Sequence, residues 1–149
     1  MKATWILVAE SSRARIFTAD TPSAALREIE TLAHPEGRQH EQQMTSDLPG
    51  KDPGVNGAGG HAYTTKVEPK QHEEISFARR IAQHLDDARK KNDYQQLLIV
   101  SAPSFLGVLR HELNSATAKL VCFELNKNLV TQSPEDIRRH LPEFLPGID

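Results

Sequence analysis

The sequence contains a single cysteine, Cys122, few aromatic residues and no long apolar run. One cysteine excludes an intramolecular disulfide, which fits a reducing compartment. No stretch approaches the roughly 18 apolar residues that a membrane-spanning helix needs. The apolar run that begins at Trp5 is short, and Glu10, Arg13 and Arg15 follow it at once, which favours a buried strand over a signal peptide. We therefore expect a cytoplasmic protein that does not enter a membrane.

Neither sign of charge is in large excess. Lysine and arginine number 18, aspartate and glutamate number 20, and the formal net charge is −2. An anionic partner must therefore be met by a local basic patch, because the molecule as a whole does not attract one. The length of 149 residues and the apolar content of 38% allow one hydrophobic core and exclude a fibrous or wholly disordered chain. We expect a single domain over residues 1–149.

Three short segments near the start predict a meander of strands. Residues 5–9 form a continuous apolar run that is typical of a central strand. Residues 13–18 alternate between polar and apolar side chains and predict the second strand of a hairpin. Residues 27–32 would also suit a short helix, but their place after a hairpin favours a third strand.

A long segment at about 34–68 has no helical or strand periodicity. Five of the eight glycines lie within eleven residues of it, beside Pro49 and Pro53. A stretch of this length without secondary structure is usually functional or disordered when it interrupts a compact domain. We expect a flexible, glycine-rich loop there and look for the function in it.

The second half predicts helices alternating with strands. A long helix begins at Pro69, a favoured residue in a first turn, and its inward face carries apolar residues at helical spacing: Phe77, Ala78, Ile81, Ala82, Leu85 and Ala88. Residues 97–100 predict a buried strand, a short helix starts near Pro103, and residues 119–125 predict a last strand. Residues 133–136 resemble a capping box that opens a final helix, which Pro142 ends.

The complete order is therefore β-β-β-α-β-α-β-α. A meander followed by strands that arrive through crossover helices predicts an α/β domain with a mixed sheet of about five strands. This is the element order of a ribonuclease-H-like fold, with the glycine-rich loop placed before the first helix.

That fold order raises the possibility of a two-metal nuclease, which the residues do not favour. Such chemistry needs carboxylates that converge from the first strand, the first helix and the fourth strand. Glu10 ends the first strand, and Glu73 and Glu74 start the helix, but the fourth strand ends in Ser101-Ala102-Pro103 without an acid. The glutamates are better explained as solvated or helix-capping residues.

A metal site is not expected, and no cofactor is predicted. Four histidines, His34, His40, His61 and His72, lie in or near the loop, but no pair has a tight ligand spacing and there is no second cysteine. Cys122 follows Val121 and precedes Phe123 in a predicted strand, so we expect an unreactive thiol in the core.

The tripeptide Gly59-Gly60-His61 is the remaining candidate for chemistry. Two successive glycines let the backbone adopt conformations that are closed to other residues. Their N–H groups could stabilise an oxyanion, and the imidazole could accept or donate a proton while it orients a water at an ester. A loop that only joins a strand to a helix would have the same composition, and the residues alone favour that simpler reading.

Two stretches near the ends of the chain resemble one protein family. Residues 5–17, Trp-Ile-Leu-Val-Ala-Glu-Ser-Ser-Arg-Ala-Arg-Ile-Phe, resemble the opening of the bacterial host-attachment protein family, and residues 133–141 resemble its close. The likeness runs through nearly the whole chain.

That family is in turn similar to the middle domain of archaeal and eukaryotic peptide-release factors. In that domain a Gly-Gly-Gln loop precedes a long helix and promotes hydrolysis of the peptidyl-tRNA ester. Gly59 and Gly60 match the two glycines, His61 stands where the glutamine would, and residues 76–82 resemble the helix that follows. The resemblance implies a ribonuclease-H-like fold and a role at the ribosome or on tRNA.

Two hypotheses follow. In the first, Gly59, Gly60 and His61 form the catalytic tip of a tRNA-ester hydrolase. Basic residues near the loop then contact phosphates: Lys66, Lys70, Arg79 and Arg80. In the second, the protein is a non-catalytic module that binds RNA or a protein partner and affects host attachment indirectly. For each of these basic residues taken alone, the sequence favours a solvated helix face over a phosphate contact.

Overall fold

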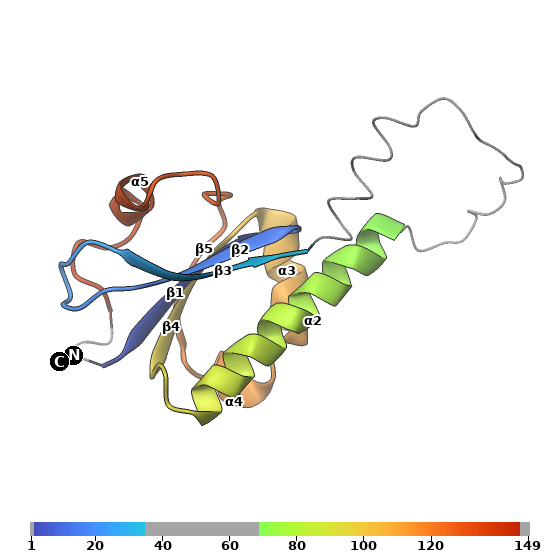
Figure 1. Ribbon diagram of the computed structural model, residues 1–149, viewed down its shortest axis with the longest axis horizontal. Coiled ribbons are helices and arrows are strands. Elements are labelled where there is room, and N and C mark those ends of the chain that lie inside the picture. Colours follow the sequence, from blue (N-terminus) through green and yellow to red (C-terminus); the bar gives the residue numbers. More distant parts are fainter. Residues whose placement is uncertain (1, 35–68, 147–149) are drawn as a thin grey trace, which may run out of the picture.

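The structure, a computed structural model, describes residues 2–34 and 69–146, with the side chains of the second range given from residue 71 (Figure 1). Its strands are β1 (Thr4–Glu10), β2 (Arg13–Thr18), β3 (Arg27–Ala33), β4 (Gln96–Ser101) and β5 (Val121–Leu125). Its helices are α2 (Pro69–Lys90), α3 (Pro103–Glu112), α4 (Ser115–Ala118) and α5 (Pro134–Arg139). The expected α/β class with a five-stranded mixed sheet is confirmed.

The strands form one sheet in the order β3-β2-β1-β4-β5. β2 pairs antiparallel with β1 and with β3, through a short turn after β1 and through residues 19–26 before β3, whereas β4 and β5 run parallel to β1. Parallel neighbours need a crossover, which α2 supplies before β4, and α3 with α4 supplies before β5. We call the edge of the sheet where β1, β4 and β5 end the carboxyl edge. β3 also ends there, because Ala33 pairs with Arg13, and Arg13 pairs with Glu10.

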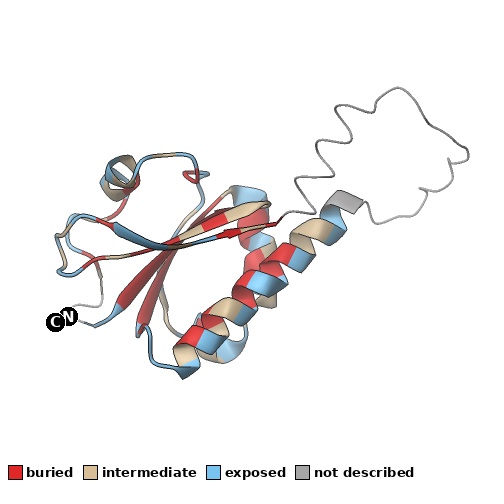
Figure 2. Cartoon of the chain, in the orientation of Figure 1, coloured by how far each residue is buried: buried red, intermediate tan, exposed pale blue. Residues whose placement is uncertain are grey.

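Alternation along the strands divides the core into two layers. α2 and α3 cover one face, over buried residues that include Trp5, Leu7, Ile16, Leu97 and Ile99. The other face is covered by α5 and the irregular segments around it, over Ile6, Val8, Phe17, Leu98 and Val100. Figure 2 shows buried residues along the central strands and on the inward sides of the helices. β1 and β4 are apolar on both sides because both of their faces are covered.

The amphipathic pattern of α2 determines which side of the helix packs on the sheet. The predicted inward face is confirmed, since all six of its apolar residues are buried. The helix ends at Lys90, and Asn92 then takes a left-handed conformation with a φ of 63°. The hydroxyl of Tyr94 donates to the carbonyl oxygen of Leu85 at 2.7 Å, and burial raises the pKa of this tyrosine to about 12.

The one-turn helix α4 was not predicted, and it delays the last strand. β5 begins at Val121, whereas the sequence predicted a strand from Lys119. Asn114 caps α4 by accepting from the backbone N–H of Thr117 at 2.8 Å. Hydrogen bonds, the largest with Asn114 and the next with Arg89, hold the pKa of Asp86 on α2 well below its usual range. Asp86 thus joins the end of α2 to α4.

Both edge strands carry an irregularity in their pairing. Ile29 is the extra residue of β3 opposite Ile16 and Phe17, and Cys122 is the extra residue of β5 opposite Leu97 and Leu98. Such bulges hinder edge-to-edge association of sheets.

The prediction that Cys122 lies in the core is wrong, because the bulge turns this residue to the exposed edge of β5. Its sulfur still lies 3.6 Å from the carbonyl oxygen of Leu97, and partial burial raises the pKa of the thiol.

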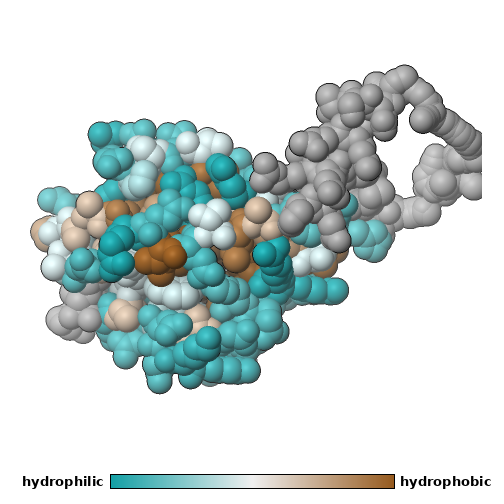
Figure 3. All heavy atoms as spheres, viewed as in Figure 1, coloured by the Kyte–Doolittle hydropathy of each residue, from teal (hydrophilic) through white to brown (hydrophobic). Residues whose placement is uncertain are grey.

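The surface of the described residues is mainly polar. Figure 3 shows a largely hydrophilic face with small separate apolar patches. Ile29 and Phe144 are the large apolar side chains that the described part of the chain exposes. Within residues 2–34 and 69–146, none of the helices has the length and apolarity that a membrane crossing requires.

Candidate functional site

The carboxyl edge receives both ends of the glycine-rich segment. The chain leaves β3 at His34 and re-enters the described structure at Pro69, the first residue of α2. Figure 1 shows the end of β3 and the first turn of α2 at the same end of the molecule. β1 and β4 also end here, with Ala9 paired to Ser101. This edge is the candidate functional site because the two elements that flank residues 35–68, the end of β3 and the start of α2, both lie at this end of the molecule.

A buried histidine lies at this edge. His34 is 4% exposed, and its ring stacks on Phe77 of α2 with the centroids 5.3 Å apart. Phe77 in turn stacks on Phe105 of α3 at 6.1 Å. The Nε2 atom of His34 is buried and has no hydrogen-bond partner among the described residues. The sequence suggested that His34 is solvent-exposed rather than a metal ligand, which is wrong, and no local pattern could have shown its burial.

The end of β1 supplies a carboxylate and a hydroxyl to the same edge. Ser12 donates from Oγ to the Oε2 atom of Glu10 at 2.8 Å. Opposite them, Ala102 caps α3 without a side-chain hydrogen bond. The strand β4 ends in Ser101, so the edge lacks the second strand-borne acid of a two-metal nuclease. Across residues 2–34 and 69–146, no group of three His, Cys, Asp or Glu side chains could hold a metal ion.

The predicted catalytic residues are not described by the structure. Gly59, Gly60, His61 and Lys66 lie outside the described residues, and Lys70 lies in the first turn of α2 with its side chain outside them. The structure therefore places Arg79 and Arg80 alone among the predicted site residues. Both are on α2, within three turns of its start.

Both of these arginines make contacts within the fold. Arg79 donates from Nε to the Oε1 atom of Glu112 on α3 at 3.1 Å, although its side chain is 70% exposed. Arg80 donates from Nη1 to the backbone carbonyl oxygen of Ala33, the last residue of β3. The two neighbours thus join α2 to α3 on one side and to β3 on the other. A nucleic acid would meet guanidinium groups that already have partners.

Two further arginines lie in residues 5–17, the stretch near the start that resembles the family. The sequence did not show that they have a structural role. Arg13 donates from Nη2 to the carbonyl oxygen of Val130 at 3.0 Å. Arg15 donates from Nη1 to the carbonyls of Val130 and Gln132, and from Nε and Nη2 to the carboxylate of Glu28. The hydrogen bond from Arg15 is the largest cause of a lowered pKa at Glu28.

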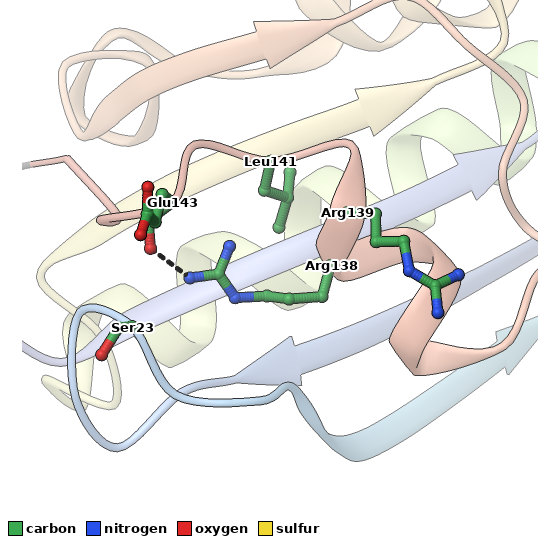
Figure 4. Close-up of a pocket in the computed structure, with 5 residues that line it drawn as sticks. All are labelled: Ser23, Arg138, Arg139, Leu141 and Glu143. Carbon is green, nitrogen blue, oxygen red and sulfur yellow. Dashed lines mark hydrogen bonds between the residues drawn. The ribbon is translucent and has the colours of Figure 1, made fainter.

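The stretch near the end of the chain contributes a matching contact through Arg138. Its guanidinium donates to four carbonyl oxygens, those of Pro22, Ala24, Pro142 and Glu143. Arg138 lines an open depression of about 410 Å³ together with Ser23, Arg139, Leu141 and Glu143 (Figure 4). Four of the five guanidinium N–H groups are thus engaged by the protein itself. The depression is therefore better explained by structure than by anion binding.

The two stretches near the ends of the sequence that resemble the family thus have a common structural role. Arg13 and Arg15 hold the segment before α5, and Arg138 holds the turn between β2 and β3. These contacts join residues 114 to 117 positions apart and fix the irregular cover of the second sheet face.

A protein-family model described as "Protein required for attachment to host cells" matches residues 5–141. The chain belongs to this family. The match includes the β1–β2 hairpin and α5, so the arginines that join the two ends of the fold lie within the family region. The family description names a biological requirement and no chemistry.

This member of the host-attachment family is also similar to two individual proteins, one by sequence and one by structure. An uncharacterized protein from Rickettsia prowazekii (strain Madrid E) is 32% identical over 77 residues. The match covers 50% of this chain and 50% of that relative, so the chain spans about half the length of the curated protein it matches. A solved structure described as "Archaeal protein" shares 10% identity over 93% of this chain and 35% of its own, with a TM-score of 0.44, too low to carry an argument.

Proposed function

We propose that this host-attachment family protein is a ribosome- or tRNA-associated module that presents Gly59, Gly60 and His61 to a peptidyl- or aminoacyl-tRNA ester. The observation that carries the proposal is that β3, which precedes residues 35–68, ends at the carboxyl edge of the sheet, and that α2, which follows them, packs on the end of β3. The backbone N–H of His34 donates to the carbonyl oxygen of Ser12, and the ring of His34 stacks on Phe77 of α2. A rigid platform of this kind is what a catalytic or binding loop needs.

The sheet order supports the ribonuclease-H-like part of the proposal. A central β1 with an antiparallel meander on one side and two parallel strands on the other is the arrangement expected of that fold. The resemblance to the release-factor middle domain adds a Gly-Gly loop before a long helix, and α2 is 22 residues long. Fold alone assigns no function, so the proposal depends on the tripeptide.

The chemistry follows from the residue types. Backbone N–H groups at Gly60 and His61 would stabilise the oxyanion that develops when water attacks the ester, an effect of roughly 10²–10³ in rate for one donor. The imidazole of His61 would orient the water and accept its proton, for a further factor of roughly 10²–10⁴. Lys66 and Lys70 would contact phosphates. Arg79 and Arg80 would do so only in addition to their contacts within the fold.

One observation favours a second candidate function, a non-catalytic RNA- or protein-binding module. Both arginines assigned to phosphate contacts are engaged by Glu112 and Ala33, which weakens the case for a dedicated tRNA surface. In that case the protein would be required for attachment to host cells only indirectly, through its binding of RNA or of a protein partner. Direct adhesion would require the protein outside the cell, and cell fractionation tests this against the cytoplasmic location that a role in translation needs.

A hydrolysis assay separates the two candidates. The rate of release of a labelled aminoacyl or peptidyl group from tRNA, with and without ribosomes, is compared for the natural protein and His61→Ala. His111→Ala is the matched control, because His111 is 87% exposed near the end of α3, a helix that begins at the carboxyl edge. If the protein is a hydrolase, the rate of release falls at least tenfold in His61→Ala and does not change in the control. Equal rates, or none above background in any form, would exclude it and leave the binding module.

A further inference from the structure

Three rings stack where α2 packs on the sheet. Trp5 of β1 is 8% exposed and stacks on Tyr94, with the ring centroids 4.9 Å apart. It also stacks on His84 of α2, at 6.0 Å and with an angle of 22° between the ring planes. Tyr94 is itself fixed by the hydrogen bond from its hydroxyl to the carbonyl oxygen of Leu85. The indole of Trp5 is thus a rigid surface against which the imidazole of His84 lies.

The same imidazole reaches the edge strand β3. Nε2 of His84 lies 3.0 Å from Oε1 of Glu30, a residue that pairs with Ile16 on the α2 side of the sheet. A carboxylate only accepts hydrogen bonds, so the nitrogen of His84 donates. The two side chains are 29% and 40% exposed, so both are partly withdrawn from water. His84 therefore connects α2 to β1 through Trp5 and to β3 through Glu30.

Both contacts of His84 depend on its charge. A protonated imidazole forms an ion pair with the carboxylate, whereas a neutral one makes a hydrogen bond that is roughly half as strong. A cation within about 6 Å of an indole ring is also attracted to the face of that ring. Histidine is the side chain that ordinarily changes its charge between about pH 5 and 8. Protonation of His84 therefore strengthens the contact of α2 with both strands.

Other charged groups near His84 leave Glu30 as its partner. Arg80 lies one turn earlier on α2 and disfavours a second positive charge, while its guanidinium donates to the carbonyl oxygen of Ala33. Asp87, one turn later, is exposed and accepts from Gln83 at 2.9 Å. Arg27 of β3 pairs with Asp20. The buried residues of β1 and β2 that face α2 are uncharged: Trp5, Leu7, Ala9, Ala14 and Ile16.

We propose that Glu30, His84 and Trp5 form a pH-sensitive contact, which holds β3 to α2 most firmly when His84 is protonated. Glu30 supplies the negative charge that offsets the cost of protonating an imidazole beside an indole ring and one turn from Arg80. β3 is an edge strand that pairs with β2 alone, and such strands open at little cost unless other elements hold them. The contact works in the same way whether the protein acts on tRNA or is a non-catalytic binding module.

The fluorescence of Trp5, the one tryptophan of the chain, reports the charge of His84. A stacked imidazolium quenches indole emission more than a neutral imidazole does, so the emission of the folded full chain is expected to fall from pH 8.5 to pH 5. His84→Gln should abolish this transition, and Glu30→Gln should move it to lower pH. Glu28→Gln is the matched control on the same strand, because Glu28 pairs with Arg15, and it should leave the transition in place. A transition that persists in His84→Gln, or none in the natural protein, would overturn the proposal.

Urea unfolding at two pH values measures the strength of the contact. Glu30→Gln is expected to lower the urea midpoint by about 0.2–0.5 M at pH 5.5 and by less than half as much at pH 8.5, because the ion pair exists only with a protonated His84. Glu28→Gln should lower the midpoint equally at the two pH values, because its partner is an arginine, which stays charged. An equal loss at both pH values in Glu30→Gln would show that the contact does not depend on the proton, and the proposal would be wrong.

Discussion

Replacement of Arg138 by methionine should destabilise the protein far more than the same change at Arg139. Arg138 donates to four carbonyl oxygens, and three of these hydrogen bonds are partly buried. Arg139 is 74% exposed and pairs only with Asp136, one turn earlier on α5, among the described residues. The two residues are adjacent and have the same charge, so a comparison of their variants isolates the effect of the carbonyl contacts.

The magnitude follows from the bonds that are lost. A hydrogen bond from a charged donor contributes about 1.5–3 kcal/mol when its acceptor is left unsatisfied and buried. Exposed or partly exposed carbonyls regain bonds to water, so we expect a total of about 3 kcal/mol for Arg138→Met. For a domain of this size that corresponds to a fall of about 6–12 °C in Tm. Arg139→Met loses one exposed ion pair and should change the free energy of unfolding by less than about 1 kcal/mol.

Urea unfolding measures this difference directly. The chain has one tryptophan, Trp5 of β1, which is 8% exposed and stacks on His84 of α2, so its fluorescence reports the opening of the core. Arg138→Lys should recover less than half of the loss, because one ammonium group cannot span four carbonyls. A free energy of unfolding for Arg138→Met within about 0.5 kcal/mol of the natural protein would refute the structural role of Arg138. Equal losses for the two methionine variants would do so as well.

Two further predictions use the shifted pKa values. The pKa of Glu28 is lowered below its usual 4.5 in the folded state, chiefly by Arg15. Its contribution to stability is therefore complete above about pH 4.5 and is lost as the pH falls through the folded pKa. The difference in unfolding free energy between the natural protein and Glu28→Gln should shrink from pH 6 to pH 3 in urea titrations, and a difference that does not vary with pH would contradict the assignment. The raised pKa of Cys122 predicts slow alkylation by iodoacetamide at pH 7.5 relative to a cysteine in an unfolded peptide, with a rate that increases with pH. Alkylation as fast as in the peptide would show that the sulfur is not desolvated.

Local pattern predicted the regular elements well. The apolar run of residues 5–9 and the helical spacing from Phe77 to Ala88 each reflect a burial pattern that the neighbouring residues impose. Such patterns determine which face of an element is buried, and the structure places these residues in the core. α4 escaped prediction because one helical turn is too short for periodicity, and its cap at Asn114 is a signal only when the turn is already known.

The long-range contacts could not be predicted in the same way. Arg138 donates to carbonyl oxygens near Pro22, more than a hundred residues earlier, and backbone carbonyls carry no sequence signal. Cys122 sits among apolar residues in the sequence, and only the register shift beside Leu97 shows that it faces outward. Arg79 and Arg80 were expected on an exposed helix face, which is correct, but their partners depend on where α3 and β3 end.

The predicted site at Gly59, Gly60 and His61 depends on a different kind of reasoning. Two glycines and an imidazole are a chemical pattern without a packing pattern, so neither periodicity nor burial constrains them. The structure adds the platform at the carboxyl edge, where His34 is hydrogen-bonded to Ser12 and stacks on Phe77 of α2. The predicted catalytic residues themselves lie outside the described part of the chain.

The most direct test of a role on tRNA is recovery of RNA and ribosomal subunits with the tagged protein from lysate across a salt series, followed by binding of purified tRNA. If the protein acts on tRNA, tRNA or the large subunit is recovered at low salt, and the recovery weakens as salt is raised. About three phosphate contacts at about 0.7 each give a slope near −2 for log affinity against log salt. Recovery of neither, or binding that does not respond to salt, would contradict a role on tRNA.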